Sequence, residues 1–512
     1  MKTTVEPGSD DVVIAERPHP GAPRPYEFPT VASNRLSNGL SILVANLPGR
    51  PLVSASIVIR GGAAAEPAEL AGSTVLAARA LSEGTERYDA IELVEAAERL
   101  GASIHADAGW DALSASAEVP ADRIAPALEL VAEMLLRPTF PISEVERLRD
   151  ERLNDLLQAQ ADPRRRAEQA FADTIYASAS PYHRPSGGTR ETVEDLTAAD
   201  LRRAYERNLD PSRATLVVAG DLGGQDVVEL AERLLGSWSR SGSAQAGDDR
   251  SVVDTAASNR RTVRVVHRPG SVQTEIRIGH RGLPRRIPDF HAVSVMSAIL
   301  GGLFNSRLNM KLREEKGYTY GAGAGFDLRR GAGPFAARAA VNTDVTVAAT
   351  LDTLTELKRM RDQPVEPSEL LAARDFLVGV FPLRFETSGA VVGAVSGLAV
   401  HRLPLDELIG YRARIEAVDE AEVGAAARAH LHVDSAAIVL VGDIDAFGAE
   451  LEAAGLGPIV IERDEIVEPA PPPDLEVAAP GPVDREDEEG PTAGAEEPEL
   501  PGPADGATLD ER

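Results

Sequence analysis

The stretch Ala214–Leu222, A-T-L-V-V-A-G-D-L, is an apolar, β-branched run that ends in Gly-Asp, which is typical of a buried strand. It returns 222 residues later as Ala436–Ile444, A-A-I-V-L-V-G-D-I. The helix expected before each strand returns at the same spacing, with Leu201 matched by Val423. A repeat this long is not a solenoid unit and indicates two tandem copies of one domain.

The segments around the repeat predict an α+β fold. Asn38-Gly39 is a strong hairpin signal between two short alternating runs, and Ser103–Val119 has the pattern of a strand pair. Ile124–Leu136 predicts an amphipathic helix, and Ser143–Ala161 predicts a long helix. We therefore expect two tandem homologous domains, each a mainly antiparallel sheet with helices packed on one face.

Composition divides the chain further. The N-terminal residues and the C-terminal residues are rich in Pro and acidic groups, and a polar run separates the two repeats. The expected division is an extended leader (1–28), a first domain (29–238), a linker (239–259), a second domain (260–463) and an acidic, Pro-rich, disordered tail (464–512).

Charge and residue usage exclude several classes of function. The 512 residues include no cysteine, so disulfides, thiolate metal sites and cysteine nucleophiles are excluded. The formal net charge of -28 argues against nucleic acid or an anionic membrane surface as a partner. No apolar run has the length of a transmembrane helix and no signal peptide is recognisable, so we expect a cytoplasmic protein.

The segment Leu300–Phe326 contains the chemistry of most interest. Its first part has helical periodicity up to Lys316, and Gly317 follows as a C-cap glycine would. Arg313 would then end a helix and Tyr320 would start a strand, so that a guanidinium and a phenol could hold one substrate carbonyl or oxyanion. Without further information, these residues favour the simpler interpretation, an ordinary helix-to-strand corner with a surface arginine.

This segment resembles the arginine/tyrosine segment of the insulinase/pitrilysin-like metallopeptidases, the inverzincins. The matching residues are Ser306-Arg307-Leu308, then Arg313-Glu314 with Gly317, then Tyr320 seven residues after the arginine. The resemblance extends over roughly Val31–Ile461. It implies two peptidase-like domains, with Arg313 and Tyr320 as residues that contact the substrate.

The resemblance also places a zinc motif, H-x-x-E-H, between Gly72 and Gly84-Thr85. The matching positions hold Val75, Ala78 and Arg79, none of which offers zinc a lone pair. The third ligand of the family, a glutamate, would fall around residues 154–162, where Asp155 is the nearest carboxylate. We therefore expect neither metal nor other cofactor in this chain, and a first domain with a degenerate zinc site.

Other candidate sites have simpler explanations. His430 and His432 with Asp434 match a turn of the first repeat, which favours a surface turn over a metal site. Ser396 lacks the glycine that a nucleophile elbow needs two residues before it. Gly321–Gly325 has neither the spacing nor the following helix of a dinucleotide site.

An intact arginine/tyrosine segment with a degenerate zinc motif is similar to the non-catalytic subunit of the two-chain members of the family. This implies a heterodimer with a homologous partner that carries zinc, acting on a peptide or unfolded protein. The glycine-rich loop of the mitochondrial processing enzyme's non-catalytic subunit is missing, since Leu300 runs through Gly301-Gly302 directly into the helix. The alternative is a structural or assembly protein that keeps the fold without proteolytic work, and a self-sufficient peptidase is the least favoured hypothesis.

Overall fold

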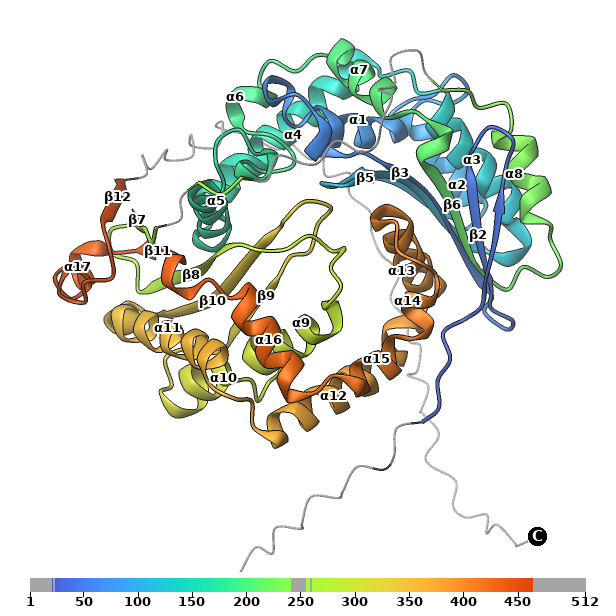
Figure 1. Cartoon of the computed structure of the whole chain (residues 1–512). Coiled ribbons are helices and arrows are strands. Elements are labelled where there is room, and N and C mark those ends of the chain that lie inside the picture. The colour runs from blue at the N-terminus through green and yellow to red at the C-terminus, as the bar shows by residue number, and fades with distance from the viewer. Residues whose placement is uncertain (1–20, 22–23, 241–254, 258–259, 464–512) are drawn as a thin grey trace, which may run out of the picture. The chain divides into compact units, whose positions relative to one another are not determined.

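The computed structural model describes residues 21, 24–240, 255–257 and 260–463, which belong to one compact unit. The predicted tail lies wholly outside the described residues, and the predicted leader and linker lie mostly outside them. Within the described part, the expected α+β fold of two tandem domains is confirmed, because the chain forms two six-stranded sheets with helices (Figure 1).

The first sheet has the strand order β1-β2-β6-β3-β5-β4. Its strands are β1 (Val31–Arg35), β2 (Ser41–Asn46), β3 (Leu52–Arg60), β4 (Ser103–Ala108), β5 (Ala112–Pro120) and β6 (Ala214–Gly220). All neighbours are antiparallel except β2 and β6, which are parallel.

The second sheet has the order β12-β7-β11-β8-β10-β9. Its strands are β7 (Val263–His267), β8 (Gln273–Arg281), β9 (Ala322–Phe326), β10 (Pro334–Asn342), β11 (Ala437–Gly442) and β12 (Ile459–Arg463). Here β7 is parallel to both β11 and β12, and the other neighbours are antiparallel. The repeated runs of the sequence form β6 and β11, which occupy the same position in the two sheets.

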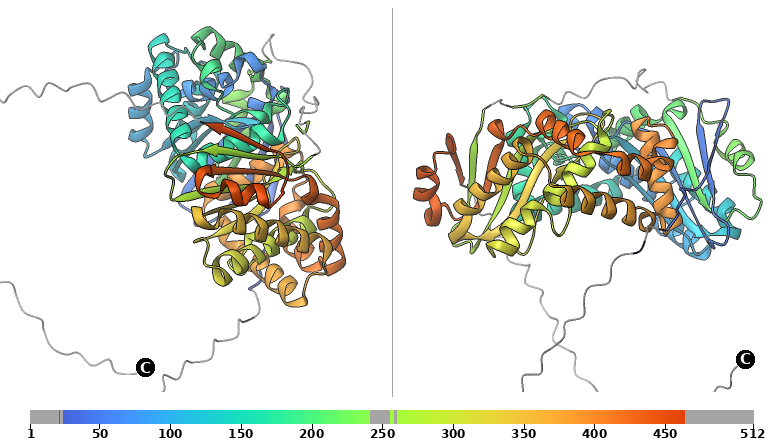
Figure 2. Two further views of the ribbon diagram at one scale, coloured as in Figure 1. Left: turned by 90° about the vertical axis from the view of Figure 1, so that its left-hand side faces the viewer. Right: turned by 60° about the horizontal axis from the view of Figure 1, so that its bottom comes forward.

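Helices of each domain, other than α5 (Pro163–Ile175) and α13 (Ser388–His401), lie on one side of its own sheet, as Figures 1 and 2 show. Those of the first domain are α1 (Ser73–Arg79), α2 (Ala90–Arg99), α3 (Ile124–Leu136), α4 (Ile142–Ala161), α6 (Arg190–Val193), α7 (Ala198–Asn208) and α8 (Val227–Leu235). Those of the second are α9 (Phe290–Ser297), α10 (Arg307–Asn309), α11 (Thr346–Asp362), α12 (Pro367–Val380), α14 (Asp406–Ile409), α15 (Tyr411–Ala417), α16 (Glu420–His430) and α17 (Ile444–Ala453). Among the described residues no single helix is long and apolar enough to cross a membrane, and only the bent pair Pro367–Phe385 and Ser388–His401 reaches those limits together.

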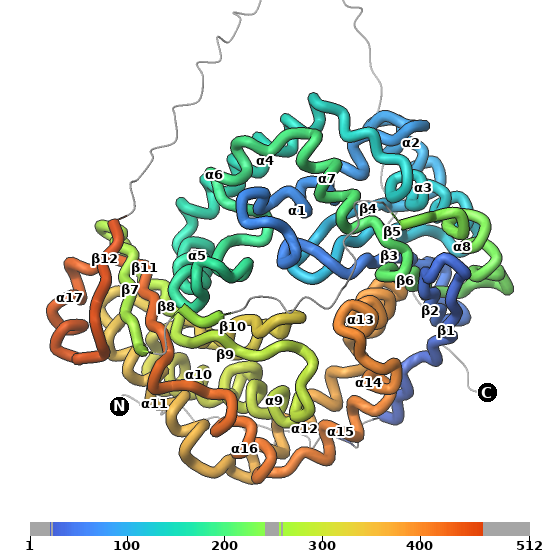
Figure 3. The backbone as a smooth tube through the Cα atoms, turned by 45° about the horizontal axis from the view of Figure 1, so that its top comes forward, coloured from blue at the N-terminus to red at the C-terminus, as the bar shows by residue number. Residues whose placement is uncertain are grey.

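One helix of each domain packs on the sheet of the other domain (Figure 3). Helix α5 lies on β11 and β8 of the second sheet, where Phe171 and Ile175 are buried against Val439 and Val441. Helix α13 lies on β3 and β6 of the first sheet, and its Ser388 hydroxyl donates to the Leu52 carbonyl at 2.8 Å. The second face of each sheet is therefore covered by an exchanged helix, which the sequence did not predict.

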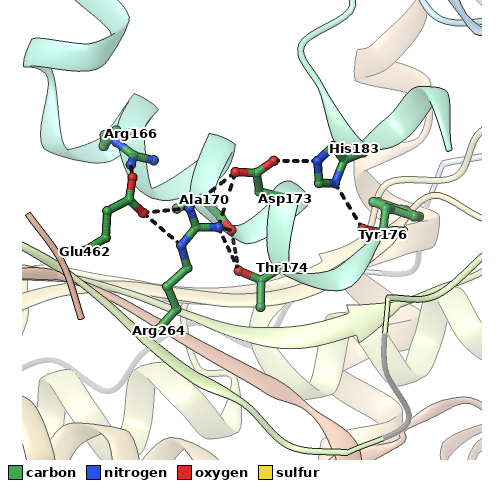
Figure 4. A network of polar contacts seen from close by, with 8 residues as sticks. All are labelled: Arg166, Ala170, Asp173, Thr174, Tyr176, His183, Arg264 and Glu462. Atoms are coloured by element: carbon green, nitrogen blue, oxygen red, sulfur yellow. Dashed lines mark hydrogen bonds and ion pairs between the residues drawn. The ribbon is translucent and has the colours of Figure 1, made fainter. Parts of the chain in front are cut away.

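Ion pairs reinforce the contact of α5 with the second sheet (Figure 4). Arg264 of β7 binds Asp173 at 3.3 Å and Glu462 of β12 at 2.6 Å, and Arg166 of α5 binds the same Glu462. His183, which follows α5, reaches the other oxygen of Asp173 at 3.0 Å. These contacts tie α5 to the edge of the second sheet through both ends of the helix.

Candidate functional site

Arg313 lies near the end of a π-helical segment, Met310–Glu315, which continues the short helix α10. Gly317 ends the helix in the left-handed region (φ 64°), and its N–H donates to the Arg313 carbonyl at 3.0 Å. The N–H of Tyr318 reaches back to the Leu312 carbonyl at 2.8 Å, which completes the glycine C-cap expected from the sequence.

Tyr320 lies in the loop before β9, because that strand begins only at Ala322. The prediction that Tyr320 starts the strand was therefore wrong by two residues. The loop is turned by Thr319, whose side chain donates to the Gly321 carbonyl and accepts the Gly321 N–H, so the backbone around Tyr320 bonds locally instead of pairing with β10.

The two predicted side chains lie on one short segment, and within the described part of the chain no hydrogen bond joins them. The Tyr320 side chain is 93% exposed. The Arg313 guanidinium lies 4.6 Å from the centroid of the Phe304 ring, and Phe304 is 64% exposed. The Nε atom of Arg313 is 3.6 Å from the Glu314 carboxylate. An exposed phenol and a guanidinium stacked on an exposed ring form a surface able to donate to a carbonyl or oxyanion outside the chain.

Buried groups beneath this surface hold the segment in place. Arg307, which is 8% exposed, binds both carboxylate oxygens of Glu369 in α12, at 2.7 and 2.6 Å. Burial alone would raise the pKa of Glu369, but the hydrogen bonds from Arg307 and the Glu366 N–H keep it below its ordinary value. The S-R-L part of the motif therefore positions the segment and does not face outward.

Asn309 fixes the start of β9. Its side-chain amide donates to the Leu303 carbonyl at 3.1 Å, and its Oδ1 accepts the Ala322 N–H at 2.8 Å. The loop with Tyr320 is thus held between Gly317 and Ala322. Sequence reasoning missed this residue, since an asparagine on an expected helix carries no signal of a contact thirteen residues away.

Helix α1 occupies the place where a zinc motif was expected. Gly72 enters it in the left-handed region (φ 95°), Val75 and Ala78 are buried in the core of the first domain, and Arg79 is exposed. A buried carboxylate, Glu66, caps the helix by accepting the N–H groups of Gly72 and Thr74 at 2.8 and 3.1 Å. Burial raises the pKa of Glu66 above its ordinary range despite these hydrogen bonds.

The carboxylate of Asp155 on α4 faces cations. One oxygen binds Arg152 and the other binds Arg165 at 2.8 Å, while Arg152 also donates to the Gly187 carbonyl at 2.9 Å. Burial would raise the pKa of Asp155, but the two guanidinium groups hold it below its ordinary value. Burial lowers the pKa of Arg152, and the nearby charge of Arg79 lowers it further.

Comparison with known proteins assigns this chain to a family. Residues 41–185 match the model of insulinase (peptidase family M16), and residues 195–377 match that of the peptidase M16 inactive domain. The chain belongs to the M16 peptidase family. An uncharacterized zinc protease of Streptomyces coelicolor is 25% identical over 78% of this M16 chain and 87% of its own length.

Another relative has a different name. A protein of Helicobacter pylori named non-peptidase homolog YmxG is 22% identical over 77% of this chain and 89% of its own length. Two crystal structures share the M16 fold with a TM-score of 0.74 over 81% of the chain. One is a peptidase M16 inactive domain of Pseudomonas fluorescens (24% identity, 98% of that chain), and the other is a protease of Helicobacter pylori (18% identity, 100% of that chain).

In this M16 chain the residues around α1 do not suit zinc. Val75 and Ala78 have no donor atom, a guanidinium repels a cation, and both oxygens of Asp155 already bind arginine. The His430 ring is engaged, since its Nε2 lies 2.7 Å from Asp289. The backbone N–H of His432 donates to Nε2 of His280, and the two rings lie 4.8 Å apart.

A different group of metal-ligating side chains, which the sequence did not suggest, lies elsewhere in the second domain. His267, Asp443 and Asp445 come together where β11 leads into α17. His267 Nδ1 accepts the Ile444 N–H, and Asp443 accepts the N–H groups of Gly270 and Asp445. These bonds cap the helix and the preceding turn, so the group has a structural role without a metal.

Proposed function

We propose that this chain is the non-catalytic subunit of a heterodimeric zinc metalloendopeptidase. Its partner is a homologous M16 subunit with an intact H-x-x-E-H motif, and its substrate is a peptide or unfolded protein. Arg313 and Tyr320 contact the substrate in trans and stabilise the oxyanion that forms at the partner's zinc.

The observation that carries the proposal is the exposure of Tyr320 on a segment that is otherwise fixed. A tyrosine ring 93% exposed contributes little to its own fold, whereas the Gly317 cap, the Asn309 bridge and the Arg307–Glu369 pair all hold its backbone. Donors held rigidly before the substrate arrives are what oxyanion stabilisation requires. A segment of this kind supports a contact with a group outside the chain.

The zinc and the general base must then come from the partner. Helix α1 has Val75 and Ala78 buried among apolar neighbours, and the cations around Asp155 would oppose a metal ion. Arg313 and Tyr320 therefore have no reactive centre of their own within the described residues, which supports a role for them in a two-chain site.

A purely structural or assembly role is the second candidate. The relative named non-peptidase homolog supports it, because that name describes a family member without peptidase activity. In that case Tyr320 and Phe304 would form part of a binding surface for another protein, with no oxyanion to stabilise.

Reconstitution tests the two candidates. The chain is expressed with an M16 homologue from the same genome that carries H-x-x-E-H, and the complex and each chain alone are assayed on an unfolded protein substrate. The proposal expects cleavage by the complex and none by this chain alone. Equal cleavage by the zinc-bearing homologue with and without this chain would overturn the proposal in favour of the structural role.

A further inference from the structure

A groove of about 410 Å³ lies between the first sheet and the exchanged helix α13. Side chains of β3, β4 and β5 form its floor, and α13 forms one wall. The floor is rich in hydroxyl groups, since the lining residues include Ser54, Ser56, Ser103, Ser114 and Ser116. The groove is distinct from the surface that carries Arg313 and Tyr320.

The register of the sheet explains this floor. One cross-strand row consists of Ser54, Glu118 and Ser103, and the next consists of Ser56, Ser116 and His105. The alternate residues of the same strands point to the opposite face, where Ala55, Ile57 and Ala115 are buried in the core. Small polar side chains therefore leave an open, hydrogen-bonding surface directly opposite α13.

One hydroxyl in the wall has no partner. Ser396 of α13 is 8% exposed and lines the groove, and its Oγ forms no hydrogen bond with any described residue. A buried polar group without a partner costs free energy, which a ligand in the groove would recover.

The second repeat reveals what fills the same space. Val217 of β6 and Val439 of β11 are equivalent positions, because they are separated by the 222 residues of the repeat. Val217 pairs with Ser56, and Val439 pairs with Arg277. Ser56 therefore occupies the position that Arg277 has in the second sheet. By the same pairing Ser116 corresponds to Arg338.

The exchanged helices correspond in the same way. Glu168 lies six residues after Asp162, the N-cap of α5, and Gly393 lies six residues after Thr387, the N-cap of α13. In the second sheet Glu168 binds Arg277 at 2.8 Å and Arg338 at 2.9 Å, and Arg277 is 1% exposed. In the first sheet all three of these positions hold Ser or Gly, and the groove remains open.

We infer that this groove binds the arginine side chain of a peptide, which supplies from outside the guanidinium that the second repeat holds within the chain. The lining residues include no lysine or arginine, and Glu118 is their one carboxylate. Glu118 accepts the Ser54 hydroxyl at 3.0 Å and has an exposed side chain, so it can also accept a guanidinium N–H. The hydroxyl groups of Ser56, Ser116 and Ser396 provide further acceptors for the planar donor.

The test measures binding of a short peptide, acetylated and amidated at its ends, with a single central arginine and alanine elsewhere. A second peptide replaces arginine with citrulline, which has the same shape without the charge. Calorimetry with the full chain should detect the arginine peptide and little or no citrulline peptide. Glu118→Gln should weaken the arginine peptide about tenfold, as loss of one charge-assisted hydrogen bond does.

Gly393→Leu separates the groove from general attraction to an acidic protein. A Cβ at Gly393 has open space around it, so leucine fills the groove without altering the net charge. Gly379→Leu in α12 is the matched control, since it too is a helical glycine with open space, away from the groove. Binding should be lost with Gly393→Leu and kept with Gly379→Leu.

Three outcomes would overturn the inference: no binding of the arginine peptide, equal binding of both peptides, or unchanged binding to Gly393→Leu. A role of the groove in contacting a substrate would rest on the proposed function. The binding itself is measured on this chain without a peptidase partner, so either idea can fail while the other survives.

Discussion

Arg307 and Glu369 form a bidentate ion pair, at 2.7 and 2.6 Å, between the arginine/tyrosine segment and α12. Glu369→Ala would leave Arg307 buried without its counter-charge. We expect a loss of about 3 kcal/mol in the free energy of unfolding, as is usual when a buried pair loses one partner. Urea denaturation at pH 7 measures it, with the exposed Glu315→Ala as control.

The same pair predicts a pH dependence. Because the folded-state pKa of Glu369 is below its ordinary value of 4.5, the pair stabilises the fold fully above pH 4.5. That stability is lost as the pH falls from 4.5 through the lower, folded-state pKa. The difference in unfolding free energy between wild type and Glu369→Gln should therefore shrink on acidification, and a difference that stays constant down to pH 3 would contradict the assignment.

Phe171 tests the exchanged helix. It is 2% exposed on α5 and belongs to a cluster with Val439 and Val441 of the second sheet. Phe171→Ala should destabilise the chain by about 3–5 kcal/mol, the usual cost of removing a buried phenylalanine. Phe376→Ala, whose ring is 47% exposed, is the control and should cost much less.

Hydrogen exchange on the same variant can show whether α5 packs on the second sheet or only within the core of its own domain. If α5 holds the two domains together, Phe171→Ala should reduce the hydrogen-exchange protection of the β11 amides. The β4 amides, in the first sheet, should lose less protection. Equal effects on both sheets, or an effect on the first sheet alone, would contradict the packing of α5 on the second.

Much of this fold could be predicted because the signals were local. The Gly-Asp endings of β6 and β11, the Asn38-Gly39 turn and the Gly317 cap each depend on neighbouring residues. The periodicity of Ile124–Leu136 likewise gave a helix at those bounds. The helix exchange could not be predicted, since an amphipathic pattern shows that one face is buried but not which sheet buries it.

The candidate site likewise has features that the local sequence predicts and features that depend on tertiary contacts. The residues of the arginine/tyrosine segment could be found from their spacing, but the loop position of Tyr320 depends on Thr319 and Asn309. Asp155 could be found from the sequence as the carboxylate nearest to the position expected for the third zinc ligand. That both of its oxygens bind Arg152 and Arg165 depends on tertiary contacts that spacing does not report.

The purified chain should hold no stoichiometric zinc. The helix at the expected motif presents a valine, an alanine and an arginine, and Asp155 is neutralised by guanidinium groups. Metal analysis after gel filtration measures this, and one tightly held zinc per chain would contradict it. His267→Ala distinguishes weak adventitious zinc at the His267, Asp443 and Asp445 group from zinc near α1.

Tyr320→Phe is the sharpest test of the proposed function. It removes one hydroxyl from a side chain that is 93% exposed, so folding and assembly with a zinc-bearing partner should be unaffected. If that hydroxyl donates to the oxyanion, turnover of the two-chain complex should fall about 10²-fold or more, as it does when such donors are deleted elsewhere.

Two further variants define how the segment acts. Arg313→Ala should raise KM as well as lower kcat, because the guanidinium would hold the substrate before and during reaction. Tyr318→Phe is the matched control, since Tyr318 lies on the same loop, packs partly against the core and should tolerate the change. A Tyr320→Phe complex that turns over at the wild-type rate, with zinc still bound to its partner, would leave Arg313 and Tyr320 as a docking surface. The structural role would then replace the peptidase role, because the proposal assigns the stabilisation of the oxyanion to the Tyr320 hydroxyl.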